Sequence, residues 1–163
     1  MQKFAVIMQL PDGKLPGFYA QVIKALATKA HVFDWEKEIL IIENMTELTP
    51  IDQILNQYNI EYEIVPVVHL PNNADLKAHY EDFGFTTLSG NTFLYASTLI
   101  LFSLQHTHED SEDYTMAITQ LDEHLIASFS LEGIKYYLAE NHLEDCFYGI
   151  AKAYQCTFRL KPF

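Results

Sequence analysis

The order of apolar segments in the first seventy residues restricts the fold of this chain more than any other feature. Phe4 to Leu10 is a short apolar run that ends at Pro11 and Gly13, a pattern typical of a buried strand. Pro16 then opens a segment with apolar residues at helical spacing, and proline is well tolerated at a first helical position. The chain therefore begins with a predicted strand followed by a predicted helix.

Residues 31–70 are predicted to form two strands, a helix and a final strand. His31 to Trp35 and Glu38 to Glu43 are predicted to be strands joined by a tight turn. Pro50 opens a second amphipathic helix, capped by Thr49, and Glu61 to Leu70 alternates and then becomes almost wholly apolar, as a strand does. The predicted order is strand, helix, strand, strand, helix, strand.

This order predicts an α+β protein whose N-terminal half has the ferredoxin-like (βαββαβ) arrangement, with both helices on one face of an antiparallel sheet. Its first and third strands are central, and these are the most apolar here, whereas Pro66 in the fourth suits an edge. The alternative is a three-stranded parallel α/β sandwich in which His31 to Trp35 is a loop.

The rest of the chain is predicted to be mostly helical, so residues 1–70 form a ferredoxin-like subdomain and residues 71–163 a helical subdomain packed on it. A final strand is expected at 156–160. The other expected segments are a helix at Ala74–Phe83, an apolar element from Thr92 to about Gln105 capped by Ser89–Asn91, a helix from Tyr114 to Phe129, a helix capped by Ser130, and a last helix from Leu143 to Tyr154.

The charge of the chain limits what it binds directly. The sequence has 22 acidic and ten basic residues, and residues 34–82 and 105–145 each carry a net charge of about −9. Residues 1–30, in contrast, contain four lysines and one acid, Asp12. Such a negative chain repels a phosphate backbone, and the third strand has no aromatic or basic side chain for RNA, so nucleic acid is not expected as a direct ligand.

The lack of several sequence motifs argues against nucleotide hydrolysis. The chain lacks a Walker loop, a Gly-x-Gly-x-x-Gly turn and a Gly-x-Ser-x-Gly elbow. The apolar segment Phe93 to Leu104 is shorter than a membrane span, so no membrane contact is expected. Two cysteines are too few for a disulfide framework and fit a reducing, cytoplasmic environment.

His106 and His108 are the best metal-ligand candidates, because both precede the carboxylates of Glu109 and Asp110. A divalent metal such as zinc is a candidate cofactor there, although a third ligand is not evident. The simpler interpretation is that these residues stabilise the ends of two helices. No cofactor is otherwise expected.

Two further sets have helical spacing. Asp75, His79 and Asp82 would share one face of the expected helix 74–83, where a carboxylate can orient an imidazole for acid/base work. His142 and Cys146 are four residues apart, as a base and a thiol could be. A solvated helix face and a buried thiol are the favoured explanations of the two sets.

The sequence therefore leaves two functional hypotheses. In the first, the protein is a small acidic protein-binding module that docks on a basic partner, in the manner of an inhibitor or immunity protein, through Glu109, Asp110, Glu112 and Asp113. In the second, it is a metal-dependent enzyme or metal-binding protein using His106, His108 and nearby carboxylates. Negative charge that only keeps the protein soluble remains a third explanation.

Overall fold

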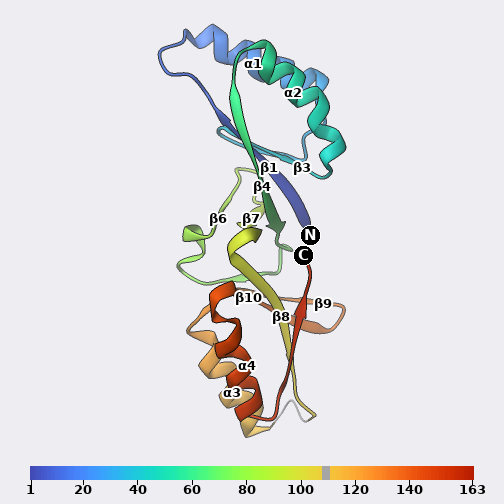
Figure 1. Ribbon diagram of the computed structural model, residues 1–163, viewed down its shortest axis with the longest axis vertical. Coiled ribbons are helices and arrows are strands. Elements are labelled where there is room, and N and C mark those ends of the chain that lie inside the picture. The colour runs from blue at the N-terminus through green and yellow to red at the C-terminus, as the bar shows by residue number, and fades with distance from the viewer. Residues whose placement is uncertain (108–110) are drawn as a thin grey trace. The chain divides into compact units, whose positions relative to one another are not determined.

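The computed structural model describes residues 1–107 and 111–163, which divide into two compact units (Figure 1). The first unit is Met1–His69 with Thr86–Phe93, and the second is Leu70–Phe85 with Leu94–Phe163. Both combine helices with antiparallel strands, so the α+β class is confirmed.

The first unit has the predicted βαββαβ order. Its elements are β1 (Gln2–Gln9), α1 (Pro16–Lys29), β2 (Asp34–Glu36), β3 (Ile39–Ile42), the 3-10 turn η1 (Met45–Glu47), α2 (Leu48–Gln57) and β4 (Glu61–His69). Among the described residues their sheet has the order β2-β3-β1-β4, continued by β7 (Thr92–Tyr95) and β6 (Gly84–Thr86). Because β1 pairs antiparallel with both β3 and β4, the three-stranded parallel alternative is wrong.

One expectation about β4 is also wrong. Pro66 was expected to mark an edge strand, but β4 lies between β1 and β7 in the sheet order. The strand β7, which covers this edge, lies beyond the first seventy residues, from which the edge position was predicted. A proline is thus accommodated inside this sheet, opposite Phe4 of β1.

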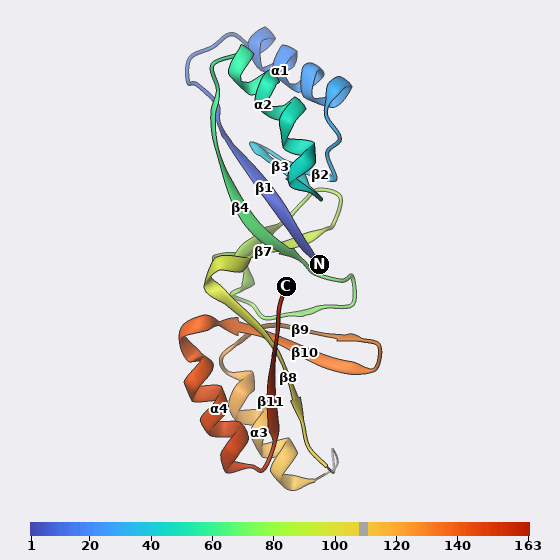
Figure 2. The same ribbon diagram turned by 45° about the vertical axis from the view of Figure 1, so that its right-hand side comes forward.

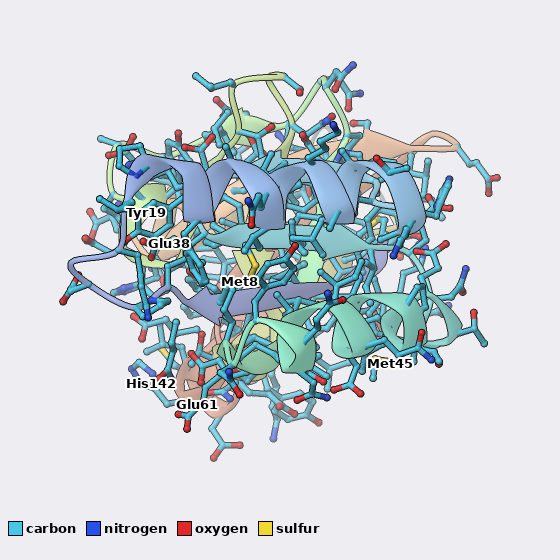
Figure 3. The ribbon with its side chains drawn as sticks, turned by 90° about the horizontal axis from the view of Figure 1, so that it is seen from above. Met8, Tyr19, Glu38, Met45, Glu61 and His142 are labelled. Carbon is cyan, nitrogen blue, oxygen red and sulfur yellow. The ribbon has the colours of Figure 1, made fainter. Side chains whose placement is uncertain are left out.

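Helices α1 and α2 lie side by side on one face of the strands β1 and β3 (Figures 1 and 2). Val6 and Met8 of β1 pack under them with Leu26 of α1 and Leu55 of α2, and Figure 3 looks onto these helices with Met8 labelled between them. Ala5, on the other face of β1, is also fully buried. A strand buried on both faces must be apolar at successive positions, which explains the continuous run seen in the sequence.

The second unit repeats the same order of elements. It contains β8 (Leu99–Gln105), α3 (Glu112–Asp122), β9 (Leu125–Leu131), β10 (Ile134–Glu140), the 3-10 turn η4 (Asn141–Leu143), α4 (Glu144–Ala153) and β11 (Thr157–Lys161). Their sheet order, β11-β8-β10-β9, matches β4-β1-β3-β2 of the first unit, and β5 (Asp75–Leu76) is added beside β9. The chain therefore contains two copies of the βαββαβ motif, although no repeat is apparent in the sequence.

The expectation of a mostly helical C-terminal half is wrong. The segment 74–83 forms β5 and the 3-10 turn η2 (Tyr80–Asp82) instead of a helix, and 92–105 forms β7, the 3-10 turn η3 (Ala96–Thr98) and β8. Ser130 lies in β9 and caps no helix. The helix 143–154 is observed as α4, and the final strand as β11.

The misreading of β9 has a physical cause. Leu125 to Phe129 are all buried, because β9 lies inside its sheet and both of its faces are covered. Apolar residues at every position satisfy helical spacing and strand spacing alike, so periodicity cannot separate the two. The turn that follows, Glu132-Gly133, has positive φ at both residues (52° and 78°), as a two-residue hairpin loop requires.

The two motifs also end their second helix in the same way. Asn59 after α2 and Gln155 after α4 both have a φ of 54°, in the left-handed region. The next amide in each motif donates back into the helix, from Ile60 to the carbonyl of Leu55 (2.9 Å) and from Cys156 to that of Ala151 (2.8 Å). This is the C-terminal cap that lets the chain turn directly into the last strand.

Among the residues that the structure describes, no helix has both the length and the apolar composition needed to cross a membrane.

We expect Gln155→Gly to raise the free energy of unfolding by about 0.5 kcal/mol, because glycine adopts a left-handed conformation without strain and this gain exceeds its extra chain entropy. Urea unfolding measures the change. Ala153→Gly, inside the last turn of α4, is the control and should destabilise by about 1 kcal/mol. A loss of stability in Gln155→Gly would contradict the assigned backbone conformation.

Candidate functional site

Two of the four acidic residues chosen from the sequence, Glu112 and Asp113, lie at the start of α3. Ser111 is its N-cap, and its Oγ accepts a hydrogen bond from the amide of Tyr114 at 3.1 Å. Glu112 and Asp113 form the exposed first turn, where the helix dipole favours negative charge. Glu109 and Asp110, the other two predicted residues, lie outside the described residues. The structure thus places two of the four predicted partner-binding side chains on an exposed helix start.

His106 contributes to the same helix start. Its Nδ1 lies 3.1 Å from Ser111 Oγ, within hydrogen-bond distance, and the same oxygen accepts from the amide of Tyr114. This contact fits the helix-capping interpretation. His108 falls outside the described residues, and within residues 1–107 and 111–163 no three His, Cys, Asp or Glu side chains gather as a metal site. Metal binding by His106 and His108 therefore stays a prediction.

The two sets chosen for helical spacing do not share a helix. Asp75 lies in β5, whereas His79 and Asp82 lie at the ends of η2, so the proposed helical face does not exist. His142 belongs to η4 and approaches Glu140, with Nδ1 and Oε2 3.5 Å apart. Cys146 is exposed on α4 rather than buried as expected.

A polar cluster that sequence reasoning missed lies on the first unit, on the face of the sheet away from α1 and α2. Its centre is Asp34 of β2, which is only 9% exposed and sits opposite Ile41 in the strand register. Its carboxylate accepts hydrogen bonds from Thr87 Oγ1 (2.7 Å), Asn91 Nδ2 (2.7 Å) and Ser89 Oγ (3.1 Å), and also from the amide of Trp35 (2.7 Å). Asp34 thus holds the whole turn 87–91 against β2.

The neighbouring acid reinforces this attachment. Glu36 Oε2 accepts a hydrogen bond from the amide of Leu88 at 3.1 Å. Inside the turn, the amide of Thr87 donates to the carbonyl of Asn91, and Gly90 supplies a φ of 85° that a larger residue adopts only with strain. The turn is therefore rigid and presents Leu88, which is 99% exposed, to solvent.

These contacts set the ionisation of Asp34. Burial by itself raises the pKa of the carboxyl, but the hydrogen bonds from Asn91, Thr87, the Trp35 amide and Ser89 outweigh it and hold the pKa below its ordinary value. A carboxylate whose oxygens are all engaged by donors is a structural anchor. It is poorly suited to act as a general base, because its lone pairs are occupied.

His69, at the end of β4, extends the cluster. Its ring stacks on Phe93, with centroids 5.0 Å apart, and meets the edge of Phe33 at 5.2 Å. Its Nε2 lies 3.2 Å from Asn91 Oδ1; because the Asn91 amide group already donates to Asp34, that oxygen accepts and His69 donates. Burial lowers the pKa of His69, with a smaller contribution from the positive charge of Lys3, and this exceeds the opposing effect of Asn91.

Lys3 completes the arrangement from β1. Its Nζ lies 3.7 Å from the centre of the Phe33 ring and 2.7 Å from Glu43 Oε1. Hydrogen bonding to Lys3 holds the pKa of Glu43 below its ordinary value. The cluster thus joins β1, β2, β4 and the turn 87–91 through charges and aromatic rings, and its geometry indicates a structural connection rather than a reaction centre.

Each motif also has a hollow where its second helix meets its last strand. The first, of about 510 Å³, is lined by Asn56, Asn59, Ile60, Glu61 and Tyr62. The second, of about 250 Å³, is lined by Tyr148, Ala151, Lys152, Cys156, Thr157 and Phe158. Their matching positions follow from the shared helix cap. A third hollow of about 320 Å³ lies beside the end of α1, lined by Ala27, Ala30, Val32, Asp34 and Trp35.

The chain matches no protein-family model and no curated protein. Among solved structures it is similar to aspartate kinase from Clostridium acetobutylicum, with 12% identity and a TM-score of 0.27; the match covers 94% of this chain and 32% of the kinase. It is also similar to a putative glycine cleavage system transcriptional repressor, with 10% identity and a TM-score of 0.25, covering 98% of this chain and 94% of that one. Similarity this weak carries no functional argument.

Asp34→Asn should reduce the free energy of unfolding by about 2 kcal/mol, because the amide keeps one acceptor oxygen and turns an N–H group toward other donors. Since the folded-state pKa of Asp34 is lowered, its contribution is full above pH 4 or so and is lost as pH falls through the folded value. Urea unfolding at several pH values should therefore show that the free energy of unfolding decreases less steeply with acid in the variant than in the wild type. Asp12→Asn, in an exposed loop, should match the wild type.

His69 is expected to lower stability in weak acid. Its folded pKa is below the ordinary value of 6.5, so the unfolded chain binds the proton more tightly. Stability is then complete above pH 6.5 and decreases as pH falls toward and through the lowered pKa. Chemical unfolding between about pH 7.5 and 5 should show a smaller pH slope in His69→Gln than in the wild type. The exposed His142→Gln is the control, and an equal slope in all three proteins would refute this assignment.

Proposed function

We propose that the protein is a non-catalytic binding module that docks on a basic protein through the acidic start of α3. The observation that carries this proposal is the exposure of Glu112 and Asp113 on a helix that contains three acids and no base. The third acid, Asp122, already forms an ion pair with Lys77 at 2.7 Å. The first-turn carboxylates are therefore the part of α3 that is available to an external cation.

Helix capping alone does not account for these two acids. Ser111 supplies the side-chain cap, so the capping hydrogen bond does not need a carboxylate. The acids still gain from the helix dipole, which is worth about 0.3–1 kcal/mol each at an exposed site. Together with Glu109 and Asp110, which precede them in the sequence, they form the densest run of negative charge in the chain. Charge of this kind attracts a basic surface and speeds encounter with it.

The geometry of the described residues favours binding over catalysis. The buried carboxylate, Asp34, is fully engaged by donors, and His106 is part of the helix cap. An acidic surface acts at the rim of an interface by steering the partner, and it needs no reactive group. The partner proposed is a protein with a basic surface, because the negative chain attracts such a surface and repels nucleic acid.

The double variant Glu112→Lys/Asp113→Lys should lose capture of a basic protein from a native cell lysate at low salt. Glu61→Lys/Glu63→Lys is the matched control, because it changes the net charge equally at exposed acids of β4 in the first unit. We expect the control to retain capture, and wild-type capture to decrease steeply as salt rises. Recovered proteins are identified by mass spectrometry.

Equal capture by both variants would show that only the net charge matters and would refute the assignment to α3. Salt-independent capture would refute electrostatic docking altogether. Because lysine in a first helical turn opposes the dipole, thermal unfolding must confirm that the α3 variant is folded.

A further inference from the structure

The first helices of the two motifs, α1 and α3, carry opposite charge. Helix α1 contains Lys24 and Lys29 and no acid, and indeed no acid occurs between Gly13 and Phe33. Its counterpart α3 has acids only, and α4 begins with Glu144 and Asp145. In a chain with a net charge of −12, a helix with an exclusively basic surface is a marked exception. Opposite charges on exposed helices of one chain allow two copies to bind each other.

The outer face of α1 also exposes apolar side chains. Ile23 is 51% exposed, and the small residue Ala27 follows it one turn later on the same face. The hollow of about 320 Å³ at the end of the helix is lined by Ala27, Ala30, Val32, Asp34 and Trp35. Lys24 lies one turn before Ala27. The surface is therefore a hollow with mostly apolar lining residues and a lysine on the helix beside it.

Helix α4 presents features that complement this hollow. Tyr148 is 60% exposed at its centre, and Asp145 and Glu144 lie three and four positions earlier, on the same face. Lys152 lies one turn later, so the acids and the lysine are at opposite ends of this face. An exposed tyrosine with neighbouring acids complements a mostly apolar hollow with a neighbouring lysine in polarity and charge.

We propose that α1 and its hollow form a docking surface for α4 of a second copy of this chain. Tyr148 of the second copy enters this hollow and contacts its apolar residues Ala27, Ala30, Val32 and Trp35, while Asp145 approaches Lys24. The fifth lining residue, Asp34, has its carboxylate engaged by the donors described above. Tyrosine is among the residues that most often dominate protein interfaces, and it loses little conformational freedom on burial. The charges orient the two helices and exclude the reverse alignment. This contact uses α4 and is separate from the α3 surface proposed for a basic partner.

Sedimentation velocity of the full chain at about 0.15 M salt, which screens the repulsion between two copies of net charge −12, tests the proposal. The wild type should self-associate with rising concentration. Tyr148→Ala should weaken association by about tenfold or more, as loss of a central aromatic does, and Ala27→Phe should do the same by filling the hollow. Leu131→Ala, at an exposed position of β9, is the control and should associate like the wild type.

A charge exchange tests the pairing itself. Lys24→Glu and Asp145→Lys should each impair self-association, because each brings like charges together. An equimolar mixture of the two variants should associate again, since the reversed charges face each other in one contact and the native charges in the other. Glu132→Lys, in an exposed hairpin turn, is the control for Asp145→Lys.

Wild-type protein that stays monomeric at every concentration, or a mixture of variants that fails to restore association, would overturn the proposal. So would unchanged association in Tyr148→Ala. These outcomes are independent of capture by the α3 surface, because the α3 residues are native in every one of these variants.

Discussion

The burial of one strand on both faces and along both edges is the constraint on which each half of the molecule depends. In the first unit β1 pairs with β3 and β4, packs Val6 and Met8 under the helices, and buries Ala5 on the opposite face. In the second unit β8 occupies the same place between β10 and β11, with Phe102 beneath its helices. The middle of such a strand must be largely apolar, and the helices that follow it can then be amphipathic in the ordinary way.

Asp34 shows how a buried charge can be used structurally. An isolated carboxylate in this position would be strongly unfavourable, but donors from one turn replace the lost water. Removing one partner leaves the others unsatisfied, so the cluster behaves as a unit and not as a sum of single bonds. Its connection to His69 through Asn91 gives the same turn a second attachment, with a different dependence on pH.

The sequence predicted the first motif well because its turns and prolines separate strands from helices, as at Pro16 and Pro50. The second motif was misread where strands are buried on both faces, since Leu125 to Phe129 fit either period. Its hairpin turn, Glu132-Gly133, lacks the asparagine or aspartate that usually signals such a loop. For the site, Ser111 and the first turn of α3 were predictable from capping rules. The cluster around Asp34 was not, because its partners lie more than fifty positions later.

The two motifs share topology, helix caps and hollows, yet their first helices, α1 and α3, differ in charge, and the shared topology does not explain this difference. The helix dipole favours acids at the start of a helix and bases at its end, and that rule applies to α1 and α3 alike. Lys29 in the last turn of α1 and Glu112 in the first turn of α3 follow it. Lys24 lies in the middle of α1, where the helix dipole does not stabilise its charge. The dipole does not explain the lack of acids in α1 either, because it would favour acids at the start of that helix. What the fold does not require is left to solubility or to recognition, and a lysine beside an apolar hollow serves recognition better, because an acid would be the more effective solubilising charge.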